Sequence, residues 1–281
     1  ALIEMLAGTG LREIEVGSFV NPKAVPQMAG TDEVFAQLQK REGVRYTAIW
    51  LNERGLDRAL SSGRVDVDGK LPLTASEPFV QRNTNRSIAD TLIEMPGWIA
   101  RYRAGGVEAN ALGVMAAFGC NFAGEIAPQT VVDLIVQAER IMLEHNCRLE
   151  RLTLADTMGW AGPEKIRRLV GAVRARWPDV DIKLHLHDTR GCAVANALAG
   201  IELGVSRFDG SIAGIGGCPF SGPNAAGNVC TEDLAFACED LGIETGLNLA
   251  ALVEAARCAE ELLGHTLPGK LMKAGTLPSR R

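Results

Sequence analysis

The sequence is poor in histidine, has no paired cysteines and contains no long hydrophobic run. Its 281 residues include four histidines and seven cysteines, and no two cysteines stand in a Cys-x-x-Cys spacing. This odd number of scattered cysteines disfavours a disulfide framework and suits a reducing compartment. No run reaches the roughly 18 apolar residues of a membrane-spanning helix, and the first residues are typical of a short amphipathic helix rather than a signal peptide. We therefore expect a cytoplasmic protein without a membrane partner.

The chain also lacks a basic block and a dinucleotide-binding glycine fingerprint. Its formal net charge of −5 argues against nucleic acid as a partner. No Gly-x-Gly-x-x-Gly motif follows the first predicted strand, which disfavours an open dinucleotide-binding sheet. Hydrophobic residues make up 47% of the chain and charged residues 22%, as in an ordinary globular protein with a large core. The length is close to that of one (β/α)8 barrel.

Short apolar stretches alternate with amphipathic ones along the chain, which predicts a parallel sheet with crossover helices. Strands are expected at 12–19, 45–51, 70–76, 107–117, 149–157, 181–189 and 206–216. Helices are expected at 30–41, 53–61, 87–104, 129–145, 163–176, 191–203, 231–241 and 248–263. We interpret this as an α/β protein, a single TIM (β/α)8-barrel domain over residues 1–281. Because the chain opens in a helix and only seven strands are found, we expect the first barrel strand to be missing from the numbered sequence.

The segment HLHDTRG at 185–191 carries the sharpest chemical signal. On a strand, residues two apart point to the same face, so His185 and His187 present two imidazoles side by side. Their position near a strand end places them at the face of a barrel where active sites lie. The spacing suits two ligands of one metal ion. The alternative is a pair of histidines hydrogen-bonded to neighbouring strands.

The segment GIGGCPFSGPNAAGN at 214–228 places Cys218 in a glycine-rich, uncharged loop. A structural cysteine favours a packed wall, whereas a loop that opens and closes over substrate suits a catalytic one. Asn228 ends the loop, and its amide oxygen is either a hard metal ligand or a turn group. Glu232 follows in the first turn of a predicted helix, where it either acts near the site or only pairs with the helix dipole.

Polar side chains also end other predicted strands. Glu15, Ser76, Asp156 and Thr157 all lie near the carboxyl ends of their strands. In a barrel these ends converge on the active-site face. The carboxylates of Glu15 and Asp156 either touch substrate or only orient neighbouring groups.

Five segments occur in a fixed order along the chain: EVGSFVNPKAVPQM, LADTMG, HLHDTRG, GGCPF and GNVCTEDL. Together they resemble the 3-hydroxy-3-methylglutaryl-CoA lyase family of metal-dependent TIM-barrel enzymes. The resemblance runs from about residue 1 to residue 265. The His-x-His pair alone is shared with related Claisen synthases, whereas the cysteine-bearing glycine loop followed by Asn228 is typical of the lyases.

The resemblance implies roles for individual residues. His185, His187 and Asn228 match metal ligands, and His185 is also expected to act in catalysis. Cys218 matches a catalytic cysteine that protonates the leaving enolate. Glu232 matches a residue that supports the site from behind the ligands. Glu15 matches a strand-end glutamate near the metal site, and Asp156 with Thr157 matches a strand-end pair close to substrate. The expected substrate-binding residues are these three with Ser76 and Arg190.

The implied activity is carbon–carbon cleavage of 3-hydroxy-3-methylglutaryl-CoA (HMG-CoA) to acetyl-CoA and acetoacetate. The expected cofactor is one Mg²⁺ or Mn²⁺, the expected partner is an acyl-CoA thioester, and a homodimer is expected. Three departures from the family pattern stand out: no Arg-Asp pair precedes Glu15, the loop after Cys218 is one residue longer, and Arg190 replaces a tyrosine. The alternatives are therefore cleavage of another 3-hydroxyacyl-CoA such as citramalyl-CoA, or an inactive barrel that only binds CoA esters.

Overall fold

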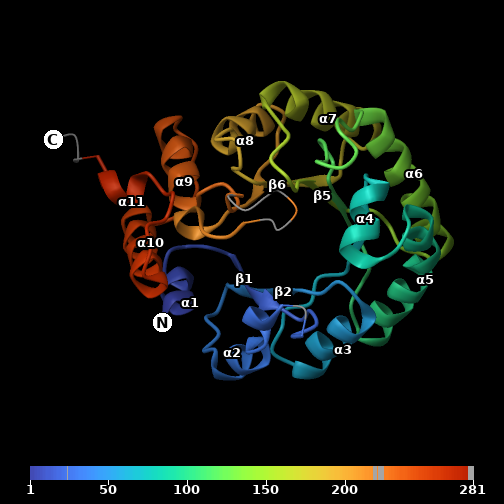
Figure 1. Ribbon diagram of the computed structural model, residues 1–281, viewed down its shortest axis with the longest axis horizontal. Helices are drawn as coiled ribbons and strands as arrows, with labels where there is room; N and C mark the ends of the chain where they lie inside the picture. Colours follow the sequence, from blue (N-terminus) through green and yellow to red (C-terminus); the bar gives the residue numbers. More distant parts are fainter. Residues whose placement is uncertain (24, 218–219, 221–224, 278–281) are drawn as a thin grey trace.

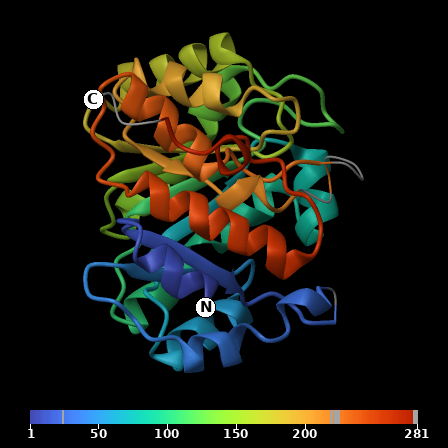
Figure 2. The same cartoon turned by 90° about the vertical axis from the view of Figure 1, so that its left-hand side faces the viewer.

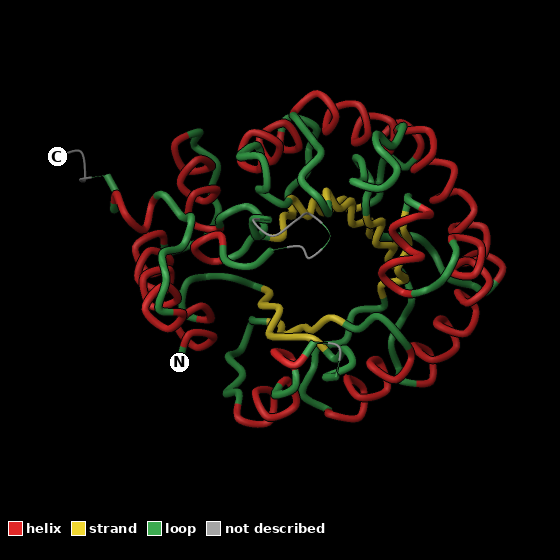
Figure 3. The backbone as a smooth tube through the Cα atoms, in the orientation of Figure 1, coloured by secondary structure: helices red, strands yellow, loops and turns green. Residues whose placement is uncertain are grey.

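The computed structural model describes residues 1–23, 25–217, 220 and 225–277. Within them lie seven strands, as the sequence predicts, and all their ladders are parallel. They are β1 (Glu13–Ser18), β2 (Arg45–Ile49), β3 (Lys70–Thr74), β4 (Ala111–Met115), β5 (Arg151–Asp156), β6 (Asp181–Leu186) and β7 (Arg207–Asp209). β1 pairs with β2, and β3 to β7 form a five-stranded sheet in sequence order. Figure 3 shows the strands as an inner ring with the helices outside it.

Most of the helices surround the strands as an outer layer (Figure 1). They are α1 (Leu2–Ala7), α2 (Thr31–Gln37), α3 (Glu53–Ser62), α4 (Glu77–Thr84), α5 (Ile88–Ala104), α6 (Pro128–Glu144), α7 (Pro163–Arg176), α8 (Ala193–Ile201), α9 (Thr231–Asp240), α10 (Leu249–Leu263) and α11 (Leu271–Ala274). Short polar side chains begin several of them: Asn52, Ser76, Ser87 and Asn248 each accept a hydrogen bond from a first-turn amide. Figure 2 shows α10 crossing the side of the molecule, where it packs on α1 and α9.

Three predicted boundaries are wrong in an instructive way. The strand expected at 70–76 ends at Thr74, because Ser76 caps α4 and Pro78 lies in the first turn of that helix. The sequence pattern predicts no helix over Glu77–Thr84. The strand expected at 107–117 is only Ala111–Met115. The strand expected at 206–216 ends at Asp209, and residues 212–214 form a 3-10 turn in which Ala213 has a φ of 54°.

The two faces of the strands differ in chemistry. On β6, Ile182, Leu184 and Leu186 are fully buried in the apolar layer beneath the helices. Burial of each such side chain stabilises the fold by about 1.5–3 kcal/mol. The alternate residues Lys183 and His185 lie on the inner face of the ring. The helices are thus held by an apolar outer face, and the inner face is free to carry polar chemistry.

Ion pairs join the strands across this inner face. Glu13 on β1 lies 2.9 Å from Arg45 on β2, and Lys183 on β6 lies 2.9 Å from Asp209 on β7. Within the described residues β1 and β7 share no ladder. Instead Lys183 Nζ lies 3.5 Å from Glu13 Oε1, and Arg207 lies 3.9 Å from the other carboxylate oxygen of Glu13. Long charged side chains therefore connect the two strands. None of the helices within the described ranges has the length and hydrophobicity needed to cross a membrane.

Candidate metal centre and active site

The two histidines of HLHDTRG lie together at the carboxyl end of β6. His185 is on the strand, and His187 follows it and forms an antiparallel bridge with Asn228. Their Nε2 atoms are 3.4 Å apart, and their ring centroids are 5.2 Å apart. The strand therefore brings both imidazoles to one point on the inner face, as the spacing predicts.

The other nitrogen of each ring already has an acceptor. His185 Nδ1 lies 3.1 Å from Asp209 Oδ2, and His187 Nδ1 lies 3.1 Å from the carbonyl oxygen of Ala226. A carbonyl or carboxylate oxygen can only accept, so the neutral form of each ring carries its proton on Nδ1. Both Nε2 atoms then point lone pairs at the same place.

His187 is held in this neutral form. Burial lowers its pKa to about 4, the nearby His185 adds to the shift, and the hydrogen bond to Ala226 opposes it. A neutral imidazole is the form that binds a metal ion.

Asn228 lies opposite His187 on the neighbouring segment. Its bridge to His187 fixes its backbone, and its Oδ1 atom is buried without a hydrogen-bond partner among the described residues. Such an atom is costly unless a ligand satisfies it.

The donor set fits one divalent cation. Two imidazole nitrogens bound at about 2.1 Å lie about 3.0–3.4 Å apart when the angle between the bonds is about 90–109°. The 3.4 Å between the Nε2 atoms of His185 and His187 matches this range. Two imidazoles with oxygen ligands suit a hard or borderline metal ion such as Mg²⁺ or Mn²⁺.

Sequence reasoning missed Asp209, which ends β7 beside the histidines. Burial alone would raise its pKa, but the hydrogen bond with His185 and the charge of Lys183 outweigh this and hold the pKa well below its usual range. Its register partner is His185, and this pairing across parallel strands becomes visible only in the structure. In the sequence the residue stands in SRFDGS without any motif.

Glu15 lies on the inner face of β1. Desolvation by the surrounding protein raises the pKa of this carboxyl group, and the negative charge of Asp209 raises it further. The cations Lys70 and Lys183 partly offset the shift. Glu15 is therefore close enough to Asp209 and His185 to feel their charges, although its side chain makes no hydrogen bond with the described residues.

Asp156 and Thr157 have local structural partners. Asp156 is fully buried, and its two oxygens accept hydrogen bonds from the backbone N–H groups of Trp160 and Ala161 at 2.7 and 2.9 Å. Burial raises the pKa of Asp156, and these two bonds oppose the shift. The Thr157 hydroxyl accepts a hydrogen bond from the N–H of Ala116 at 2.9 Å. The pair therefore ties the turn after β5 to the end of β4.

Ser76 and Arg190 are likewise engaged with backbone. Ser76 is buried and caps α4 through the N–H of Phe79. The Arg190 guanidinium donates to the carbonyl oxygens of Met158 and Gly159 at 2.9 and 2.7 Å. These contacts place Arg190 against the turn after β5.

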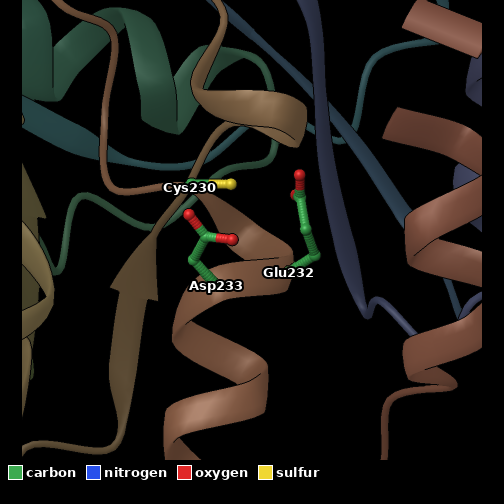
Figure 4. Close-up of side chains that lie close together, drawn as sticks. All are labelled: Cys230, Glu232 and Asp233. Carbon is green, nitrogen blue, oxygen red and sulfur yellow. The ribbon is translucent and has the colours of Figure 1, made fainter. Parts of the chain in front are cut away.

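A second polar cluster lies at the start of α9. Figure 4 shows Cys230, Glu232 and Asp233 with their terminal atoms gathered together, all within 4.8 Å of one another. Glu232 is fully buried and accepts a hydrogen bond from the N–H of Ala213 at 3.1 Å. Burial raises the pKa of Glu232. Burial also raises the pKa of the Cys230 thiol, and the negative charge of Glu232 raises it further. Glu232 thus bonds to the turn that carries Ala213 and lies beside Cys230 and Asp233.

Cys218 lies outside the described residues. The neighbouring Phe220 is described, and its ring packs edge-on against Phe79 of α4 at a centroid distance of 5.0 Å. Its carbonyl oxygen accepts a hydrogen bond from the Asn121 amide at 3.1 Å. The Asn121 side-chain oxygen in turn accepts from the Trp160 indole at 2.7 Å. These contacts join Phe220 to the loops that follow β4 and β5.

The HMGL-like family matches residues 1–258 of the chain. The chain belongs to this family. An (R)-citramalyl-CoA lyase from Chloroflexus aurantiacus is 38% identical over 286 residues, covering 98% of this chain and 86% of the relative. A hydroxymethylglutaryl-CoA lyase from Pseudomonas mevalonii is 39% identical over 253 residues, covering 90% of this chain and 81% of the relative. The crystal structure of a hydroxymethylglutaryl-CoA lyase from Pseudomonas aeruginosa has a TM-score of 0.86 at 36% identity and covers 97% of this chain and 88% of that one.

Membership in the HMGL-like family confirms the predicted family, the TIM-barrel fold and a carbon–carbon lyase activity. The two curated relatives carry different substrates in their names, HMG-CoA and citramalyl-CoA, at nearly equal identity. Both substrates are acyl-CoA thioesters.

Proposed function

We propose that the chain is one lyase domain that uses a single divalent cation to cleave HMG-CoA into acetyl-CoA and acetoacetate. The observation that carries this proposal is the set of spare donor atoms at the end of β6. Two Nε2 lone pairs meet at 3.4 Å, and the Asn228 oxygen beside them has no partner among the described residues. Such a set is costly in a folded protein unless a cation completes it.

The reaction breaks the bond between a carbon that bears a hydroxyl group and the α-carbon of the thioester. The hydroxyl proton must leave, and the thioester fragment departs as an enolate that must gain a proton. A bound Mg²⁺ or Mn²⁺ supplies Lewis acidity to the hydroxyl group and to a substrate carboxylate.

The chain's own residues hold and move the protons. The ring of His185 is oriented by Asp209, and Glu15 lies on the adjoining inner face with a pKa raised by desolvation, which favours proton exchange by this carboxyl group. We assign substrate binding to Glu15, Ser76, Asp156, Thr157 and Arg190. The last four act by positioning, because their polar atoms already bond backbone groups. Glu232 supports the segment that carries Asn228.

Cys218 is proposed as the acid that protonates the enolate. Replacing Cys218 with Ser should lower turnover by about 10²–10⁴-fold, the usual contribution of one acid–base group, and leave metal affinity unchanged. Cys258→Ser on α10 is the matched control, because this thiol lies on the outer helical layer. Unchanged turnover of Cys218→Ser would show that Cys218 is not the acid and has only a structural role.

Citramalyl-CoA is the second candidate substrate, because a citramalyl-CoA lyase is 38% identical to the chain and the HMG-CoA lyase 39%. The products separate the two: HMG-CoA yields acetoacetate, and citramalyl-CoA yields pyruvate, each with acetyl-CoA. We expect acetoacetate formation from HMG-CoA to have the higher kcat/KM in a Mn²⁺-loaded assay. Faster pyruvate formation from citramalyl-CoA would support the second candidate, and cleavage of neither would support a barrel that only binds CoA esters.

A further inference from the structure

We propose that Asp209 is a positioning residue that fixes the proton of His185 on Nδ1, and that Lys183 locks Asp209 in place for this role. The proposal rests on the proposed metal function of His185 and names two residues that lie outside every motif of the sequence. Asp209 would touch neither the cation nor the substrate, and it would act only through His185.

The first step is the geometry of the Asp209 carboxylate. Its Oδ2 atom lies 3.1 Å from His185 Nδ1, and its Oδ1 atom lies 2.9 Å from Lys183 Nζ. Each oxygen therefore faces a different donor. β6 and β7 pair directly at His185 and Asp209, so the contact is set by strand register and not by a flexible loop.

The second step is the environment of Lys183. Its ammonium group lies between Asp209 at 2.9 Å and Glu13 at 3.5 Å, and its side chain is only 13% exposed. Glu13 is in turn paired with Arg45 at 2.9 Å. Lys183 is thus held from both sides, so Asp209 meets a fixed cation and cannot rotate its Oδ1 atom away without losing that ion pair.

The third step is that only a carboxylate satisfies both neighbours. An asparagine at position 209 has one oxygen, and the Lys183 ammonium group, with no acceptor of its own, would attract it. The amide NH₂ would then face His185 Nδ1 and favour the tautomer with the proton on Nε2. That tautomer removes the lone pair that points at His187. Partners of this kind typically change metal affinity by 10- to 100-fold when they are lost.

The test measures Mn²⁺ affinity of the full chain after removal of metal, by titration calorimetry without substrate. Asp209→Asn should lose affinity by about 10- to 100-fold. Lys183→Met should also weaken binding, and Lys183→Arg, which keeps the charge, should restore most of it. Asp181→Asn is the matched control, because Asp181 lies on the same strand as His185, pairs with Arg207 at 2.9 Å and does not touch a histidine. Wild-type affinity in Asp209→Asn, or an equal loss in Asp181→Asn, would overturn the proposal.

A second readout does not depend on metal or activity. Nitrogen-15 NMR of the four histidines in the metal-free protein reports which ring nitrogen carries each proton. We expect His185 to be protonated on Nδ1 in the wild type and to shift toward Nε2 in Asp209→Asn, with His265 unchanged. An unchanged His185 signal would overturn the proposal even if binding changed. If the wild type binds no Mn²⁺, the metal function fails, and the NMR result still decides the role of Asp209.

Discussion

Two groups of polar side chains lie near one another at the carboxyl end of the sheet, and they differ in what their atoms already do. At the end of β6, the Nε2 atoms of His185 and His187 face only each other at 3.4 Å, and the buried Oδ1 atom of Asn228 has no hydrogen-bond partner among the described residues. At the start of α9, Asp233 accepts from the backbone N–H groups of Lys270 and Leu271 at 2.7–3.1 Å.

The difference separates a binding site from a structural support. The second group has the composition of a metal site, with a thiol and two carboxylates within 4.8 Å. However, Asp233 accepts from the backbone N–H groups of Lys270 and Leu271 at the start of α11. Glu232 accepts from the N–H of Ala213 through Oε2, which leaves its buried Oε1 atom without a partner among the described residues. Spare, converging donor atoms are therefore the better sign of a ligand than residue type alone.

The largest expected effect is on the first group. His187→Ala should abolish metal-dependent cleavage and metal binding, because it removes one of the two converging nitrogens. In EDTA, its free energy of unfolding should stay close to that of the wild type, since among the described residues this ring bonds only the Ala226 carbonyl and the ring of His185. Calorimetric Mn²⁺ titration and urea unfolding measure both, with His265→Ala as the exposed control. Retained cleavage would remove His187 from the site.

The second group should give the opposite result. Asp233→Ala should lower the free energy of unfolding by about 1.5–3 kcal/mol, because it removes charge-assisted hydrogen bonds to the backbone. Its Mn²⁺ affinity should stay within about threefold of the wild type, well below the losses typical of residues that orient a ligand. Glu239→Ala, an exposed carboxylate on the same helix, is the control. A large loss of metal affinity without a loss of stability would mean that the second group is itself a cation site.

The smallest effect concerns pH. The pKa of His187 is about 4 in the folded protein and near its ordinary value of 6.5 in the unfolded chain. Between these values the unfolded chain binds more protons, so stability rises with pH across this window and is lost as pH falls through it. In EDTA, the wild type should lose more stability between pH 7 and pH 4.5 than His187→Gln. Equal losses in urea unfolding would show that burial does not hold this ring neutral.

The strand pattern predicts the barrel well because its inner and outer faces alternate with a period of two. It also places His185 and His187 together, since the strand predicted at 181–189 contains both, although β6 itself ends at Leu186. It misses α4, because Ser76 belongs to a run that looks like the end of a strand. Only the structure shows that the strand stops at Thr74 and that Ser76 caps a helix. It cannot find Asp209, because contact with His185 depends on the register between β6 and β7. Asp156 ends β5 and Ser76 lies just after β3, as expected. Their hydrogen bonds to backbone N–H groups depend on turns that the sequence does not specify.

The most direct test of the account is the metal content and activity of the wild-type chain. The protein is stripped with EDTA, assayed with HMG-CoA, and then titrated with Mn²⁺ while acetoacetate and bound metal are both measured. The account predicts no cleavage without metal and full cleavage when one cation is bound per chain. Undiminished acetoacetate formation by the metal-free protein would contradict it.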